Sequence, residues 1–239
     1  MKQNQFLKGV KDGFPICLGY LSVAFAFGIF AVSSSLSVKE ALLISMTNVT
    51  SAGQLAAVPC IVGGGSLIEL AVSQLVINSR YALMSVSLSQ KLDDKVTLPH
   101  RFIIAFVNTD EVFAVATSQK ENVSKKYMYG LILTPYVGWS LGTLIGAVAG
   151  DVLPASIISA LSIAIYGMFI AIVVPEIKEN KSTAICAAIA CVLSILFYFV
   201  PFLKAVPQGF VIIICACVAA VVAALLFPIK IKEVQADEI

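Results

Sequence analysis

The sequence predicts an all-α polytopic membrane protein with seven to eight hydrophobic helices, one or two of them broken or re-entrant. Of the 239 residues, 59% are hydrophobic and 13% are charged, whereas soluble domains are about 25% charged and 45–50% apolar. Seven stretches also approach the roughly 20 apolar residues that a transmembrane helix needs. These stretches are apolar on most faces, which argues against the alternating strands of a β-barrel.

The apolar stretches follow one another along the chain with short polar connectors between them. They are Phe14–Ala31, Ala41–Val62, Leu67–Leu88, Tyr127–Ala149, Ile157–Val174, Thr183–Val200 and Gly209–Ile229. An eighth, shorter stretch, Phe102–Thr117, is interrupted by four polar residues, 108–111. We expect a cytoplasmic tail at 1–12, a single transmembrane domain at 13–232 and a C-terminal tail at 233–239.

Positive residues mark the cytoplasmic side of a membrane protein. They cluster at the N-terminus and at 91–101, 120–126, 178–181 and 230–232. Three apolar stretches separate the first two clusters, and an odd number of crossings would put these clusters on opposite sides. Either Ala41–Val62 is re-entrant or one cluster faces outward. The small, polar centre of this stretch, 47–54, favours a helix break, which membranes tolerate only where the freed backbone is buried or lines a cavity.

Glycine and proline positions suggest an internal repeat with units 13–90 and 127–203. Pro15, Gly19, Gly28, Gly53 and Pro59 have counterparts at Pro135, Gly138, Gly146, Gly167 and Pro175. Duplicated architecture is typical of secondary transporters. Glycines 138, 142, 146 and 150 also recur every four residues. That spacing predicts a helix contact surface, either within the chain or towards a partner.

Two polar stripes run along Leu67–Leu88 at helical spacing. One stripe consists of Gln74, Asn78, Tyr81 and Ser85, and the other of Glu69, Ser73, Arg80 and Ser87. Glu69 and Arg80 lie roughly 16 Å apart along the helix axis and cannot pair. Arg80 therefore needs a partner from another helix or must reach water by snorkelling. Charges inside a membrane are functional by default.

The broken centre of Ala41–Val62 offers hydroxyls, amides and unwound backbone, which suit the charged groups of a zwitterion. Ser51, Gly53 and Gln54 are its candidate substrate-binding residues. The alternative for Ser51 and Gly53 is that small residues let helices pack closely. This packing alternative is weaker for Gln54, because burying an amide without a hydrogen-bond partner is costly.

Asp110 and Glu111 interrupt the eighth stretch, in the sequence FVNTDEVFAV. An uncompensated carboxylate at the membrane centre costs at least about 2.5–3.5 kcal/mol. Neighbouring helical residues point about 100° apart, so the two acids cannot share one site. We expect one to face a cavity and the other a second partner such as Arg80 or solvent. A re-entrant segment would carry them to membrane depth as proton-coupling groups, or Asn108, Thr109 or Asp110 could cap a helix at the surface.

The remaining motifs point to no cofactor, no metal and no enzyme. All six cysteines lie in apolar stretches without a CxxC pair, and the single histidine, His100, is in a connector. There is no G-x-x-x-x-G-K-[ST] phosphate loop and no HExxH. No basic run is long enough to bind nucleic acid. Two classes of function remain, a secondary transporter and a scaffold subunit whose partner carries the transport.

Four stretches resemble the branched-chain amino acid permeases of the AzlC type. They are GVKDGFPICLGYLSVAFAFGI at 9–29, SMTNVTSAGQLAAVP at 45–59, LVINSRYALMSVSL at 75–88 and VNTDEVFAV at 107–115. The matching positions are Gly53 and Gln54, then Asn78 and Arg80, then Asp110 and Glu111. The chain departs from the family at Tyr81, where a histidine is frequent, and at Pro59 and Cys60, where aliphatic residues are usual.

The resemblance implies multi-pass transport in the bacterial plasma membrane, usually export of branched-chain amino acids. It also implies a small hydrophobic partner subunit of the AzlD type. Ser51, Gly53, Gln54, Asn78 and Arg80 are then expected to bind substrate. Asp110 and Glu111 are expected to couple transport to protons. An aliphatic cavity separates substrates that differ by one methylene by only about 1–3 kcal/mol, so overlapping recognition of valine, leucine, isoleucine and methionine is expected.

Overall fold

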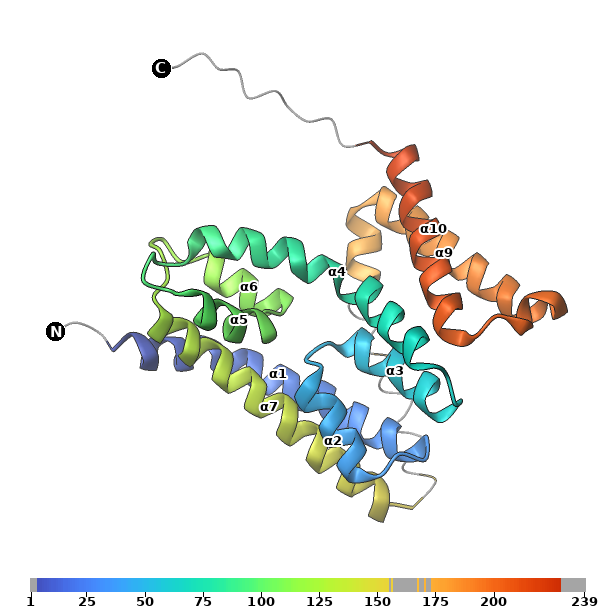
Figure 1. Cartoon of the computed structure of the whole chain (residues 1–239), viewed down its shortest axis with the longest axis horizontal. Helices are drawn as coiled ribbons and strands as arrows, with labels where there is room; N and C mark the ends of the chain where they lie inside the picture. The colour runs from blue at the N-terminus through green and yellow to red at the C-terminus, as the bar shows by residue number, and fades with distance from the viewer. Residues whose placement is uncertain (1–3, 155, 157–166, 168–169, 171–172, 229–239) are drawn as a thin grey trace. The chain divides into compact units, whose positions relative to one another are not determined.

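The computed structural model describes residues 4–154, 156, 167, 170 and 173–228, and every regular element among them is helical. The chain divides into two units, residues 1–169 and 170–239. Four of the described helices are long and apolar enough to cross a membrane, as a polytopic membrane protein requires. They are α1 (Gln5–Ser33), α7 (Lys125–Val152), α9 (Lys181–Phe199) and α10 (Gln208–Leu226) (Figure 1).

Helices α1 and α7 form a closely packed parallel pair. A Cβ atom built on Gly138 would meet Cys17, one on Gly142 would meet Leu21, and ones on Gly146 and Gly150 would meet Phe25 and Ile29. The contacts advance in the same direction along both helices, so the helices run parallel. The predicted glycine ridge is therefore confirmed as a contact surface within the chain. Small residues let two backbones approach this closely.

The parallel pair gives the first unit a basic end and a distal end. The basic end holds the first turns of α1 and α7, near Gln5 and Lys125, and the distal end holds their last turns, near Ser33 and Val152. Helix α1 begins at Gln5, inside the segment 1–12 that the sequence suggested as a tail. Lys8 and Lys11 near the start of α1 lie at the same end as Lys125 and Lys126 at the start of α7, as the positive-inside pattern predicts.

The stretch predicted at Ala41–Val62 is a helical hairpin. Helix α2 (Val38–Thr47) and helix α3 (Ser51–Val62) are separated by a break at 48–50. Leu36 and Ala41 before the break and Val58 after it pack in one cluster with Phe27, Ala31 and Ala147 near the distal end. The Met46 carbonyl, beside the break, accepts a hydrogen bond from Tyr136 in the middle of α7. The hairpin thus enters from the distal end and returns to it, which supports the re-entrant alternative.

Helix α4 (Leu67–Lys91) runs from the distal end to the basic end. Its 25 residues reach about 37 Å, which is enough to cross the first unit. After its last turn, the Lys91 carbonyl accepts from Val123 N at 2.9 Å, and Asp93 N donates to the Val123 carbonyl at 3.0 Å. These bonds hold the end of α4 beside the start of α7. The basic clusters at the N-terminus, 91–101 and 120–126 therefore share one end, which removes the parity conflict found in the sequence.

The eighth stretch is a second hairpin, made of α5 (Leu98–Phe106) and α6 (Asp110–Thr117) around a break at 107–109. Its outer ends lie at the basic end, where Arg101 Nε donates to the Val96 carbonyl and Lys8 Nζ donates to Gln119 Oε1. At the break, the Phe106 ring lies 6.2 Å from the Tyr136 ring. Tyr136 thus contacts both hairpins beside their breaks, so the two tips reach the same level from opposite ends.

Two hairpin-plus-helix units of opposite direction result, α2–α3–α4 and α5–α6–α7 (Figure 1). Ser37 and Thr97, which precede the two hairpins, are 60 residues apart, as are Asn48 and Asn108 in the two breaks. Inverted repeats of this kind are common in secondary transporters. The separate repeat expected from 13–90 and 127–203 stays a prediction, because much of Ile157–Val174 lies outside the described residues.

The second unit contains the two apolar helices predicted at Thr183–Val200 and Gly209–Ile229. They are observed as α9 and α10, joined through a short 3-10 helix, Pro201–Ala205. Asn180 caps α9 by accepting a hydrogen bond from Ser182 N at 3.0 Å. The two helices pack against each other.

Candidate functional site

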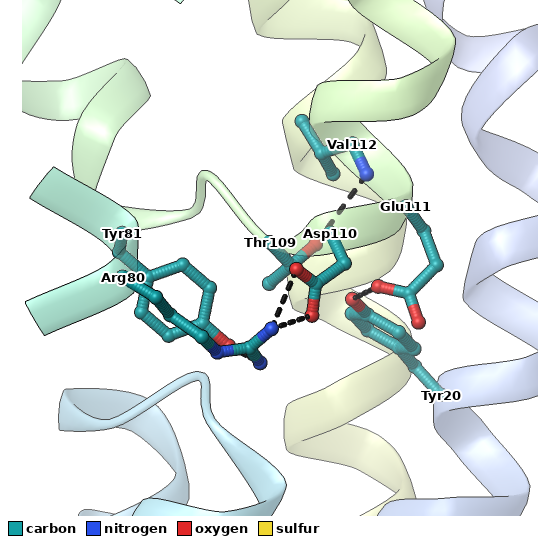
Figure 2. A network of polar contacts seen from close by, with 7 residues as sticks. All are labelled: Tyr20, Arg80, Tyr81, Thr109, Asp110, Glu111 and Val112. Atoms are coloured by element: carbon teal, nitrogen blue, oxygen red, sulfur yellow. Dashed lines mark hydrogen bonds and ion pairs between the residues drawn. The ribbon is translucent and has the colours of Figure 1, made fainter. Parts of the chain in front are cut away.

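An ion pair joins α4 to the tip of the second hairpin. Arg80 Nη1 lies 2.7 Å from Asp110 Oδ1 and 2.6 Å from Asp110 Oδ2 (Figure 2). The two side chains are 54% and 50% exposed. Arg80 therefore has the partner from another helix that the sequence required, and of the two candidate acids that partner is Asp110.

Tyr81 connects the same arginine to the first hairpin. Arg80 Nη2 donates to the Tyr81 hydroxyl at 2.9 Å, and the guanidinium carbon lies 4.6 Å from the centre of the Tyr81 ring. The Tyr81 side chain also lies close to Thr50, the last residue of the first break. Adjacent residues on α4 thus touch both helix breaks.

Glu111 points to a different neighbour from Asp110, as the helical angle between adjacent residues predicted. It accepts a hydrogen bond from the Tyr20 hydroxyl on α1 (Figure 2). The Tyr20 ring packs edge-on against Trp139 of α7, with 5.2 Å between ring centres. Tyr20 is near the middle of α1, so Glu111 lies well away from both ends of the helix pair.

The sequence left two interpretations of 108–111, a helix cap at the surface and a re-entrant segment at membrane depth. The structure supports part of each. Thr109 caps α6 by accepting from Val112 N at 3.5 Å, so a polar residue does cap this helix. The cap lies at the hairpin tip, however, beside the middle of α1 and α7 rather than at their ends. The acids of the first turn also gain from the positive end of the helix dipole.

An amide network joins the first break to α4. Gln74 Oε1 accepts from Asn48 Nδ2 at 3.0 Å and from Asn78 Nδ2 at 3.3 Å, and Gln74 Nε2 donates to the Gly53 carbonyl at 2.9 Å. Further along α4, Ser85 accepts from Asn108 Nδ2 at 3.2 Å. The predicted stripe of Gln74, Asn78, Tyr81 and Ser85 therefore faces both hairpin breaks.

Four of the five predicted substrate-binding residues lie at or beside the helix breaks, and the fifth, Gln54, lies in a separate cluster. Asn78, Arg80 and Gly53 lie where α4 meets the breaks. A Cβ on Gly53 would be 2.7 Å from Gln74 Oε1, so glycine makes room for the amide network. Ser51 is the first residue of α3, whose N-cap Thr50 makes no side-chain capping bond.

Gln54 is fully buried in a separate polar cluster. Its Oε1 accepts from Ser45 Oγ at 3.0 Å, and Ser45 shares a hydrogen bond with Thr143 of α7. The hydrogen-bond partner of Gln54 therefore lies on α2, and Ser45 links it onward to α7 rather than to α4. Ser45, Thr143, Asn48 and Asn108 were not among the substrate-binding residues expected from the sequence. The position of each asparagine within a break was the signal that could have identified it.

Several buried amide atoms around the breaks have no hydrogen-bond partner in the described structure. They are Gln54 Nε2, Asn78 Oδ1 and Asn108 Oδ1. An unpaired buried polar atom costs about 1–3 kcal/mol. Such atoms mark places where water or a ligand completes the hydrogen bonding. The site can therefore accept further polar groups beside its ion pair.

An apolar cavity of about 400 Å³ runs along α5 and the first half of α7, from Phe6 and Tyr129 near the basic end to the tip of the second hairpin. Phe106 and Val107 at the tip line it together with Tyr136 and Ile132 of α7. Within the described ranges, no three His, Cys, Asp or Glu side chains come together as a metal site. The polar chemistry of this region is thus carried by amides, hydroxyls and the charged side chains of Arg80, Asp110 and Glu111.

Comparisons with known proteins match the part of the chain that carries this site. The model of the AzlC protein family matches residues 15–153, which span α1 to α7. A membrane protein of Archaeoglobus fulgidus is 35% identical over 185 residues, covering 77% of this chain and 81% of the relative. The inner membrane protein YgaZ of Escherichia coli is 28% identical over 228 residues, covering 92% and 91%. No solved structure matches the chain.

Proposed function

Because the chain belongs to the AzlC family of multi-pass membrane proteins, we propose that it is a secondary transporter that exports branched-chain amino acids with proton coupling. The observation that carries the proposal is the meeting of two helix breaks, from opposite ends, at the Arg80–Asp110 ion pair. Secondary transporters hold their substrates near the membrane midplane, at broken helices between repeats. A scaffold would have no need of half-exposed charges at this level.

The proposed substrates are valine, leucine, isoleucine and methionine. The proposal is supported by the apolar cavity of about 400 Å³ that extends to the hairpin tip and offers an aliphatic side chain a surface formed by Phe106, Val107 and Tyr136. Ligand sites of this kind are mostly apolar, with a few polar groups that fix orientation. Because one methylene changes binding by only about 1–3 kcal/mol, the four substrates should compete with one another.

Asp110 and Glu111 are the proposed proton-coupling groups. Protonation of Asp110 would remove the charge that pairs with Arg80, and protonation of Glu111 would remove the charge that accepts from Tyr20. Each event would loosen the second hairpin from one neighbour, α4 or α1. A proton could in this way change which end of the site is open.

The full assembly is proposed to contain seven to eight membrane helices and a small hydrophobic AzlD-type subunit. In support, several large apolar side chains of α4 are exposed in the first unit, including Leu67, Leu75 and Leu83. These side chains need lipid or another apolar surface to cover them. The repeat units 13–90 and 127–203 belong to the same proposal.

Amino acid efflux tests the proposal against the scaffold alternative. Cells preloaded with leucine would express this chain alone, the small partner alone, or both together. A transporter that needs its partner gives efflux only with both chains. Efflux by the partner alone at the full rate would make this chain a scaffold and overturn the proposal, as would efflux of lysine without efflux of leucine.

A further inference from the structure

The contact between Arg80 and Asp110 leaves room for a better partner. Only Nη1 of the guanidinium touches the Asp110 carboxylate, and it contacts both oxygens, at 2.6 and 2.7 Å. Nη2 donates instead to the neighbouring Tyr81 hydroxyl. Arginine binds carboxylates most strongly through two parallel N–H bonds from two nitrogens. A free carboxylate that approaches Arg80 can adopt that geometry, which Asp110 does not.

The pair is also accessible to a solute. Both side chains are about half exposed, at 54% and 50%. They lie at the level of the two hairpin tips. Asn48 and Thr50 belong to the tip of the first hairpin, and Asn108 and Thr109 belong to the tip of the second. Charged side chains at this depth do not face lipid without a large cost. The exposed side of the pair is thus suited to an aqueous or ligand-filled space.

From this geometry, and resting on the proposed function, we propose that a zwitterionic amino acid binds by inserting between Arg80 and Asp110. The substrate carboxylate replaces Asp110 on the guanidinium, and the substrate ammonium pairs with the Asp110 carboxylate. In the structure, the two side chains neutralise each other. Asp110 then serves substrate binding in addition to the proton coupling proposed above, which it shares with Glu111, the acid that accepts from Tyr20 on α1.

Charge balance gives this site its selectivity. A zwitterion carries one charge of each sign, so both side chains remain paired after it inserts. A carboxylic acid without an amino group would leave Asp110 unpaired, and an amine without a carboxylate would leave Arg80 unpaired. An unpaired charge at this depth is strongly unfavourable. Asn108, in the break just before Asp110, adds an unpaired Oδ1 acceptor for a substrate ammonium, which has three donors to satisfy.

Competition in membrane vesicles tests the inference. Vesicles carrying this chain and its partner would take up labelled leucine in the presence of valine, of isocaproate (leucine without its amino group) or of isoamylamine (leucine without its carboxylate). Wild-type uptake should be inhibited by valine and by neither analogue. Asp110→Asn should improve inhibition by isocaproate relative to valine by roughly tenfold or more, since the unfavourable unpaired carboxylate is gone.

Two further variants make the test complete. Arg80→Gln, which is expected to lose transport, is tested by thermal stabilisation of the purified protein. Isoamylamine should stabilise this variant more than it stabilises the wild type, which keeps the test valid if Asp110→Asn fails to insert. Asp94→Asn, a matched change at an exposed acid of the basic end, should keep the wild-type order of inhibitors. Equal inhibition of the wild type by valine and isocaproate, or an unchanged order of ligands in both site variants, would overturn the inference.

The inference and the proposed function can fail separately. If the wild type takes up no amino acid, the proposed function is wrong, and ligand binding is then measured as thermal stabilisation of the purified protein. Stabilisation by leucine, and by neither isocaproate nor isoamylamine, would still support the zwitterion site. Stabilisation by isocaproate to the same extent as by leucine would contradict it.

Discussion

Arg80 on α4 and Asp110 on α6 form an ion pair with a 2.6 Å contact, at the level where two helical hairpins from opposite ends of the α1–α7 pair meet. The same arginine donates to Tyr81, which reaches towards Thr50 in the other hairpin. Movement of either hairpin would therefore disturb the contacts of one guanidinium. Substitution of Arg80 should therefore impair the proposed transport cycle.

Arg80→Lys should reduce leucine efflux sharply, by roughly tenfold or more, while the protein still inserts. Lysine keeps the charge but loses the planar fork, so it cannot contact Asp110 and Tyr81 as arginine does. Efflux would be normalised to the amount of protein in the membrane. The matched control is Arg101→Lys, at the basic end, where Arg101 binds the carbonyls of Val96 and Ser89. Near-normal efflux by Arg80→Lys would exclude a two-nitrogen role for the guanidinium.

Glu111→Gln should weaken the dependence of efflux on the pH gradient, because glutamine cannot titrate. Tyr20→Phe removes the hydroxyl that donates to Glu111 but keeps the carboxylate, so the dependence of efflux on the gradient should remain. Both variants keep the Arg80–Asp110 pair, so leucine exchange without a pH gradient should persist. If Glu111→Gln and Asp110→Asn both keep the wild-type dependence on the gradient, the Thr109-capped helix is structural and proton coupling by these acids is wrong.

Cysteine labelling should place both ends of the first hairpin on one side of the membrane. In a background without native cysteines, Lys39→Cys and Leu67→Cys should react with an impermeant maleimide from outside intact cells. Asp94→Cys and Asn122→Cys, at the ends of the second hairpin, should react only after the cells are opened. All four positions are exposed. Labelling of Lys39→Cys and Leu67→Cys from opposite sides would mean that 41–62 crosses the membrane.

Gly146→Ala should destabilise the first unit, because its added Cβ would overlap the Phe25 carbonyl of α1. Overpacking of this kind costs about 1–3 kcal/mol. Gly19 on α1 is the matched control, since a Cβ there meets no atom within 4 Å. Gly19→Ala should be neutral, or more stable by up to about 1 kcal/mol through helix propensity. Thermal unfolding in detergent distinguishes the two, and equal melting temperatures would contradict the packing described for α1 and α7.

The sequence predicted the breaks and stripes of this fold because their signals are local. Polar residues inside apolar stretches marked both hairpin tips, and helical spacing alone aligned Gln74, Asn78, Tyr81 and Ser85 on the face that meets them. Glycine spacing identified the ridge of α7. These features depend on residues near one another in the chain, so composition and periodicity reveal them.

Other features depend on tertiary neighbours and were out of reach. The sequence left open whether 41–62 turns back, because its polar centre is compatible with a break in a crossing helix as well. It could not choose between Asp110 and Glu111 as the partner of Arg80, since that depends on where α6 begins. Gln54 was grouped with Arg80 by proximity to the break. It accepts instead from Ser45 of α2, which shares a hydrogen bond with Thr143 of α7, and no local pattern indicates these contacts.

Leucine counterflow in proteoliposomes tests the central claim most directly. Liposomes containing this chain with its small partner, and loaded with unlabelled leucine, should accumulate labelled leucine transiently in the absence of any ion gradient. Valine and isoleucine should compete with the label, lysine should not, and Arg80→Lys should abolish the accumulation. Absence of counterflow in the wild type, or counterflow at the wild-type rate in Arg80→Lys, would contradict transport through the site between the two hairpin tips.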